Sequence, residues 1–135
     1  SVVSGFHFMR FLSKEKLSAF YSKAYRFPGG EKAAEYFAAA AGNIDFDQLI
    51  KTRKAINRVD LEDRLAELPI PALVMVGTRP GEFFIELSRR LAGTLETETV
   101  LLEGALDPSN LTATEDFDRR VLSFIEKNSI EETAG

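Results

Sequence analysis

The sequence predicts an α/β protein in which a cap-like helical segment precedes a β-α-β-α unit with parallel strands. In the first half, apolar residues recur at the i, i+3, i+4 spacing of amphipathic helices. After Pro69 and Pro71 the pattern changes to short continuous apolar runs separated by amphipathic stretches, which is typical of buried parallel strands joined by helices. We therefore expect a helical segment over residues 1–68, the β-α-β-α part over 69–127 and a flexible tail over 128–135, together forming one compact unit.

Four helices are expected before the prolines, and three of them have a recognisable start. Ser13 is a candidate N-cap for the first, and Asp45 with Gln48 forms a D-x-x-Q capping box for the third. Asp60 is the candidate N-cap of a short fourth helix, and a Pro-Gly-Gly turn separates the first helix from the second. The expected ranges are 14–26, 31–41, a helix that opens at residue 45, and 61–68.

The second part is expected to alternate strand and helix. Its elements are a strand over 72–76, a helix over 81–92, a strand over 97–103 and a last helix that opens at a capping box of Thr112 and Glu115. The side chains expected to face inward are Phe84, Leu87, Ser88 and Leu91 in the first of these helices, and Phe117, Val121, Phe124 and Ile125 in the last.

Two parallel strands make a poor sheet, because each leaves unpaired backbone groups along its outer edge. Val2 and Val3 are candidates for a third strand, but the sheet remains short even with them. We therefore expect the chain to associate with a second copy of itself or with a different chain.

Composition excludes several function classes. The formal net charge of −4 disfavours nucleic acid and anionic membranes as main partners, and residues 69–135 carry most of the negative charge. The chain has no cysteine, so disulfides, thiolate nucleophiles and zinc–thiolate sites are excluded. The absence of cysteine fits a cytoplasmic location, no apolar run reaches the ~18 residues of a membrane span, and no motif calls for a cofactor.

The second part also resembles a known family. Leu65-Ala-Glu-Leu-Pro-Ile-Pro71, followed by Ala72-Leu-Val-Met-Val-Gly77, has the pattern helix, linker, proline, apolar strand, glycine. A helix, a second strand, the loop Glu103-Gly-Ala-Leu-Asp-Pro108 and a closing helix follow. This order resembles the C-terminal half of an α/β-hydrolase-fold protein and implies a partial α/β-hydrolase-like sheet. The resemblance covers residues 65–127, whereas 1–64 match only by position, where that family inserts a helical cap.

The departures from the family pattern bear on function. The position of the family's catalytic acid falls at Pro80, which cannot ionise. The position of its histidine falls at Asp107, which is an acceptor at neutral pH and no substitute for an imidazole base. The Gly-x-Ser-x-Gly elbow and the His-Gly oxyanion segment, which belong to the front half of that fold, are absent from the sequence. The resemblance therefore implies a pseudoenzyme-like chain with no catalytic residue of the family retained.

Aromatic residues crowd the first helices. Ordinary core packing is the simplest interpretation, but their number also predicts an apolar pocket or a partner-binding groove. The residues assigned to that site are Phe6, His7, Phe8, Phe11, Tyr21, Tyr25 and Tyr36. His7, the only histidine, is either a base for a partner's nucleophile or, more simply, a partly buried ring held by one hydrogen bond.

Two other features have a functional and a structural interpretation. The turn from Thr78 to Glu82 opens a helix and carries Arg79, so it suits either an anion or a plain strand-to-helix connection. Glu103, Asp107 and Glu115 belong to an acidic cluster that lacks the spacing of a calcium loop, and helix-start preference explains part of it. We predict no metal site.

The function expected from the sequence is therefore a binding or structural role for a non-catalytic α/β-hydrolase-like protein or fragment. Its sheet would be completed by self-association, as a homo-oligomer, or by a partner chain. One alternative is the C-terminal subunit of an esterase-like hydrolase, with a companion N-terminal chain that carries the serine nucleophile. Another is a carrier of a small apolar ligand.

Overall fold

The computed structural model describes residues 2–67 and 69–132, and it divides the chain into two compact units, Ser1–Asp60 and Leu61–Gly135. Each unit is described by itself. The first is entirely helical across its described residues, and the second contains the only strands in the described part of the chain.

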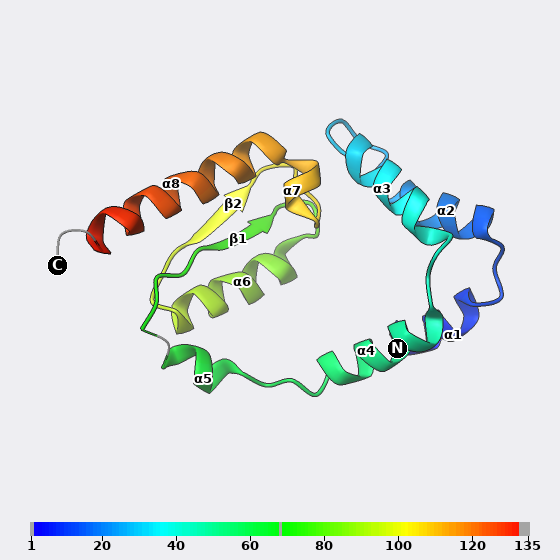
Figure 1. The fold of residues 1–135 in the computed structure, drawn as a ribbon, viewed down its shortest axis with the longest axis horizontal. Helices are drawn as coiled ribbons and strands as arrows, with labels where there is room; N and C mark the ends of the chain where they lie inside the picture. The colour runs from blue at the N-terminus through cyan, green and yellow to red at the C-terminus, as the bar shows by residue number, and fades with distance from the viewer. Residues whose placement is uncertain (1, 68, 133–135) are drawn as a thin grey trace. The chain divides into compact units, whose positions relative to one another are not determined.

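The first unit contains four helices, α1 (Val2–Met9), α2 (Lys14–Lys23), α3 (Glu31–Ala41) and α4 (Phe46–Ile56). They pack in two pairs, α2 against α3 and α1 against α4 (Figure 1). Few apolar side chains are buried among the described residues of this unit, and two of them are alanines: Leu17, Ala33, Ala41 and Ile50. This unit therefore has a thin core and leaves large aromatic side chains such as Phe8 and Phe11 in solvent.

Local sequence signals position these helices. The Ser13 side chain accepts a hydrogen bond from the Lys16 amide, and the Asp45 side chain accepts one from the Gln48 amide, so both predicted caps are confirmed. The turn between α2 and α3 closes on Gly30, where a Cβ would lie 2.2 Å from the Tyr25 carbonyl oxygen. Only glycine fits that approach, which explains why the chain turns there.

The second unit runs α5 (Glu62–Ala66), β1 (Val74–Gly77), α6 (Glu82–Thr94), β2 (Thr99–Leu102), α7 (Ser109–Thr112) and α8 (Thr114–Glu132). The two strands pair in parallel, with Val74 opposite Thr99 and Gly77 opposite Leu102. Figure 1 shows α6 and α8 on opposite sides of the strands. The fold is thus mixed and helix-rich around a small parallel sheet, and the predicted β-α-β-α order of an α/β unit is confirmed at this level.

The core of this unit lies at the centre of the sheet and under α6. Val74 and Leu102 come from the strands, Ile85 and Ala92 from α6, and Ala105 from the loop after β2. Gly77 is packed so tightly against that loop that a Cβ would lie 2.3 Å from the Ala105 carbonyl oxygen. The end of β1 and the loop after β2 therefore share one close backbone contact.

Several sequence-based expectations differ from the structure. Val2 and Val3 belong to α1 and form no third strand. The residue that precedes α5 is Leu61, with no side-chain cap, so Asp60 lies one position too early to be its N-cap. Residues 128–132, expected in the tail, continue α8, and residue 68 and residues 133–135 lie outside the described residues.

Of the side chains predicted to face inward on α6, only Ser88 is partly buried, and the other three predictions were wrong. Ile85 and Ala92 are buried, whereas Phe84, Leu87 and Leu91 are 49%, 54% and 39% exposed. A two-stranded sheet offers only a narrow surface, so one stripe of the helix covers it and the neighbouring apolar stripe is left uncovered. In α8, Ile125 is likewise 52% exposed, against expectation.

The close contact at Gly77 can be tested by adding a single methyl group. We expect Gly77→Ala to lower the free energy of unfolding by about 1–3 kcal/mol, because the Cβ has no space beside a backbone carbonyl. Gly93→Ala is the matched control: nothing lies within 4 Å of its Cβ position in α6, and alanine should raise helix stability by about 0.5–1 kcal/mol. Denaturant titrations followed by circular dichroism measure both, and equal effects would contradict the packing described.

Candidate functional site

The carboxyl ends of β1 and β2 are the first place to look for a site, because ligands of open α/β sheets bind beyond the carboxyl ends of the strands. The loops that leave these ends are bonded to each other. The Thr78 hydroxyl accepts a hydrogen bond from the Gly104 amide at 2.9 Å and donates one to Glu103 Oε1 at 3.3 Å. Arg79 Nε donates to the Gly104 carbonyl oxygen at 2.9 Å. We call these four residues the strand-end lock.

The backbone reinforces the strand-end lock. The Thr78 amide donates to the Leu102 carbonyl oxygen, and the Arg79 amide donates to that of Ala105. Gly104 takes a φ of +69°, a conformation that glycine adopts without strain. The Arg79 side chain is therefore engaged with the neighbouring loop, which favours the structural interpretation of the Thr78 to Glu82 turn over anion binding.

The two positions that the hydrolase resemblance singles out both lie on these loops. Pro80 lies at the start of the turn into α6, and Asp107 follows Leu106 and precedes a cis peptide bond to Pro108. Neither side chain can act as an imidazole base, and a proline cannot orient one. His7 lies in α1 of the first unit, where it is exposed. These two loop positions therefore do not supply the acid and the histidine that the family pattern requires.

A second interaction holds the loop after β2. Thr112 is the buried polar residue of α7, and its hydroxyl accepts from the Leu106 amide at 3.1 Å while donating to the Leu106 carbonyl oxygen. This role replaces the predicted capping box, because α8 begins at Thr114. The Thr112 side chain therefore closes the loop that contains Asp107.

Some of the charges in this unit form ion pairs on the helix surfaces. Arg89 bonds to Glu86 and to Glu82, and these hydrogen bonds raise the pKa of its guanidinium. Asp116 bonds to Arg119 and Arg120 at the start of α8. Within residues 2–67 and 69–132, no three His, Asp or Glu side chains converge as a metal site requires.

The aromatic residues of the first unit are only partly brought together. Tyr21 and Tyr25 line an open hollow of about 500 Å³ together with Phe20, Phe37 and the residues 23 and 24. Tyr25 stacks on Phe37 with ring centroids 5.0 Å apart, and Phe20 meets the edge of Tyr21. Partial burial raises the pKa of Tyr21, whose hydroxyl contacts the sulfur of Met9.

The other residues assigned to that site lie elsewhere. Phe6, His7 and Phe8 belong to α1, Phe11 follows it and is 84% exposed, and Tyr36 is 59% exposed. None of them lines the hollow. Sequence reasoning left out Phe37, although its place four residues after Ala33, the most buried residue of α3, puts it on the face that meets α2.

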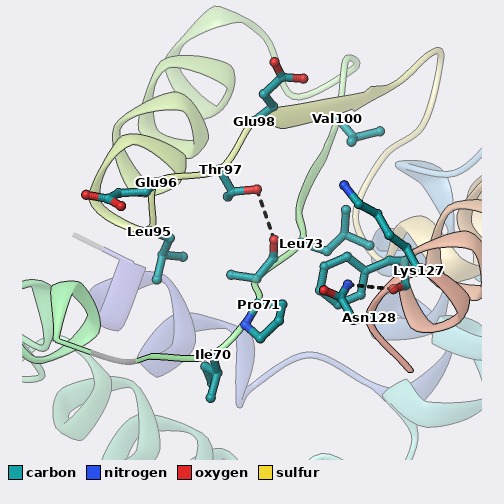
Figure 2. A pocket seen from close by; sticks show the side chains of 12 residues that line it. Ile70, Pro71, Leu73, Leu95, Glu96, Thr97, Glu98, Val100, Lys127 and Asn128 are labelled. Atoms are coloured by element: carbon teal, nitrogen blue, oxygen red, sulfur yellow. Dashed lines mark hydrogen bonds between the residues drawn. The ribbon is translucent and has the colours of Figure 1, made fainter. Parts of the chain in front are cut away.

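A smaller hollow of about 300 Å³ lies in the second unit at the amino ends of the strands. Figure 2 shows Leu73, Val100 and Lys127 around it, with the Thr97 hydroxyl donating to the Ala72 carbonyl oxygen at 3.1 Å. Asn128 Nδ2 donates to the Phe124 carbonyl oxygen. Two of its polar side chains, Thr97 and Asn128, are thus engaged locally, and the hollow lies at the end of the strands opposite the strand-end lock.

Compared with models of protein families, with curated proteins and with solved structures, the chain matches none. In the part of the chain that the structure describes, no helix combines the length and the hydrophobicity needed to cross a bilayer.

The role of Thr112 can be tested with a nearly isosteric change. We expect Thr112→Val to reduce the free energy of unfolding by about 1–3 kcal/mol, because the Leu106 amide and carbonyl lose their partner in a partly buried loop. Thr94→Val is the control, since that hydroxyl bonds an exposed helix carbonyl, and its effect should stay within about 0.5 kcal/mol. Chemical denaturation measures the free energy of unfolding of both variants. A Thr112→Val variant as stable as the unaltered protein would show that Thr112 does not close the loop.

Proposed function

We propose that this chain is a non-catalytic α/β-hydrolase-like protein with a binding or structural role, and that it works as part of an assembly that completes its sheet. The partner is either a second copy or a companion chain. The observation that carries the proposal is the sheet itself, which has two strands of four residues each in the described structure. We place the protein in the cytoplasm, in line with a cysteine-free sequence.

A two-stranded sheet is marginal in water, and three or more strands or good helix cover are needed for independent stability. Here the helices cover the sheet incompletely, since Leu101 of β2 is 39% exposed, and the helices themselves leave Phe84 and Leu122 in solvent. Burying the remaining exposed half of such a side chain contributes about 1 kcal/mol. Association at the sheet would therefore stabilise the unit and hide its apolar surface.

The chemistry of the strand-end loops supports the non-catalytic part of the proposal. Thr78 bonds Glu103, and Arg79 bonds the Gly104 carbonyl oxygen, so these side chains stabilise the loops. Pro80 and Asp107 occupy the positions where the family places an acid and a base. A hydrolase built on these loops would need a nucleophile, a base and an orienting acid from elsewhere.

The first experiment is the native mass of the purified chain by light scattering, with a thermal melt of the same sample. We expect either an oligomer that melts cooperatively or a monomer with a broad, non-cooperative melt that sharpens when a partner is added. A monomer with a sharp melt would contradict the proposal, because the two-stranded sheet would then be stable alone. Esterase activity that copurifies with the chain and survives His7→Ala would contradict its non-catalytic part.

A second candidate function is supported by the aromatic hollow, whose lining, which includes Tyr21, Tyr25 and Phe37, is mostly apolar. Such surfaces bind small apolar molecules. Tyr25 and Phe37 stack on each other within its lining, and Lys23, which also lines it, suits a ligand with one anionic end. The hollow would make the first unit a carrier of a small apolar ligand.

This candidate predicts that Nile red binds the protein with enhanced fluorescence. Phe37→Ala should weaken binding about tenfold or more, because it removes one face of the hollow. Phe20→Ala, at a ring already 58% exposed, tests the same hollow with less risk to folding. Phe11→Ala is the control outside it and should leave the affinity unchanged. If all three variants bind alike, the dye is not in this hollow.

A further inference from the structure

The turn between α2 and α3 has a second hollow beside the aromatic one. Its volume is about 410 Å³, and Tyr25 lines both hollows, so they adjoin at that ring. Both volumes are in the range of small-molecule sites in proteins. The second hollow is lined by residues of the turn and of the start of α3: Tyr25, Arg26, Phe27, Pro28, Glu31 and Ala34.

Backbone hydrogen bonds of the turn hold the walls of this second hollow. The Phe27 amide donates to the Tyr25 carbonyl oxygen at 2.9 Å, and the Gly30 amide donates to the Phe27 carbonyl oxygen at 2.9 Å. Gly30 is buried, and a Cβ there would also come within 3.2 Å of the Phe27 ring. The rings of Tyr25 and Phe27 therefore stand on a turn whose backbone is already fixed by close contacts.

Two positive charges flank the ring that the hollows share. Lys23 lines the aromatic hollow, and Arg26 lines the second one. None of the ion pairs in the described part of the chain involves either residue. The Arg26 amide donates to the Lys23 carbonyl oxygen at 3.3 Å, so the two residues belong to one turn. A ligand that lies over Tyr25 therefore has a cation on the lining at each side.

The acidic group in these linings is already engaged. Glu31 lines the second hollow, and its Oε2 accepts a hydrogen bond from the Gly29 amide at 2.9 Å. In the aromatic hollow, the Tyr21 hydroxyl contacts the Met9 sulfur. The linings are thus mostly apolar, and the charges on them that have no ion-pair partner are positive.

From this combination we infer that the two hollows form one site for an amphipathic anion, a ligand with an extended apolar body and a single acidic group. The acidic group would lie between Lys23 and Arg26, and the body would extend over Tyr25 into both hollows. The inference rests on the second candidate function, the carrier of a small apolar ligand, and names the chemical class of that ligand.

Charge and surface together select this class. A nucleic acid or an acidic peptide carries many charges and would leave the apolar lining in contact with water. A neutral apolar molecule would fill the hollows and leave Lys23 and Arg26 without a partner. A carboxylate on an apolar chain satisfies both the lining and the two cations.

The test compares decanoate with 1-decanol, which has a chain of the same length and no charge. Isothermal titration calorimetry with the full chain measures both dissociation constants. We expect decanoate to bind more tightly at low salt, and the difference to shrink as the salt concentration is raised, because exposed ion pairs are screened.

A double substitution tests the two cations. Lys23→Gln with Arg26→Gln should weaken decanoate binding about threefold to tenfold and leave 1-decanol binding unchanged. Lys16→Gln with Lys32→Gln is the matched control, because it removes the same charge at exposed lysines of α2 and α3 that line neither hollow. The control should leave both affinities unchanged.

A filling substitution tests whether the ligand spans both hollows. Ala34 is partly buried in α3 and lines the second hollow only. Ala34→Leu should weaken decanoate binding severalfold by occupying that hollow, while Nile red still binds in the aromatic hollow, which also shows that the variant is folded. Ala39→Leu, at an exposed position of α3 that lines neither hollow, is the control.

The outcomes separate this inference from the carrier function. If decanoate binds no more tightly than 1-decanol, or if the two double variants weaken it equally, the inference is overturned, and the carrier function stands on the binding of Nile red. A neutral Ala34→Leu overturns the single site that spans both hollows. If neither decanoate nor Nile red binds, the inference and the carrier function are both overturned.

Discussion

The second unit depends on the close approach between the end of β1 and the loop after β2. Gly77 has no Cβ, so the Ala105 carbonyl can lie against its backbone. That approach brings the Arg79 amide within reach of the same carbonyl and puts Thr78 beside Gly104. Four ladder positions alone would hold the strands weakly. The loop contacts extend the pairing beyond the strands and give the unit its most tightly bonded region.

This arrangement has a consequence for chemistry at the carboxyl ends of the strands. Side chains that hold the loops together are not available to a substrate without loosening the fold. Thr78, Arg79 and Glu103 are all engaged in such contacts, and Thr112 closes the next loop from inside. At the end of the sheet where α/β proteins usually place their reactive groups, these side chains hold the loops together. The proposed binding of a small apolar ligand is placed elsewhere, in the aromatic hollow.

Sequence reasoning succeeded where the signal is local. Ser13 and Asp45 act as caps because a side-chain oxygen three residues before an unpaired amide needs no tertiary context. The strand–helix–strand order followed from apolar runs between proline and glycine. Tertiary context decided the rest. Phe84, Leu87 and Leu91 have the spacing of a core stripe, and only the width of the sheet shows that a different stripe is buried. Thr112 looks like an N-cap until the position of Leu106 is known. The aromatic hollow needed the packing of α2 on α3 to bring Phe37 to Tyr25.

The error at α6 is itself informative. The apolar arc of α6 is wider than the sheet surface that the helix covers, so the helix is suited to apolar contacts on more than one side. The sequence contains that arc whether the second contact is made by the same chain or by another. The ion pair of Glu82 and Glu86 with Arg89 shows that the opposite flank is suited to water. On α8 the exposed Leu122 and Ile125 share their flank with Asp118, so that surface is mixed. Burial of the exposed apolar side chains of α6 is therefore what would join the stability of this unit to the proposed assembly.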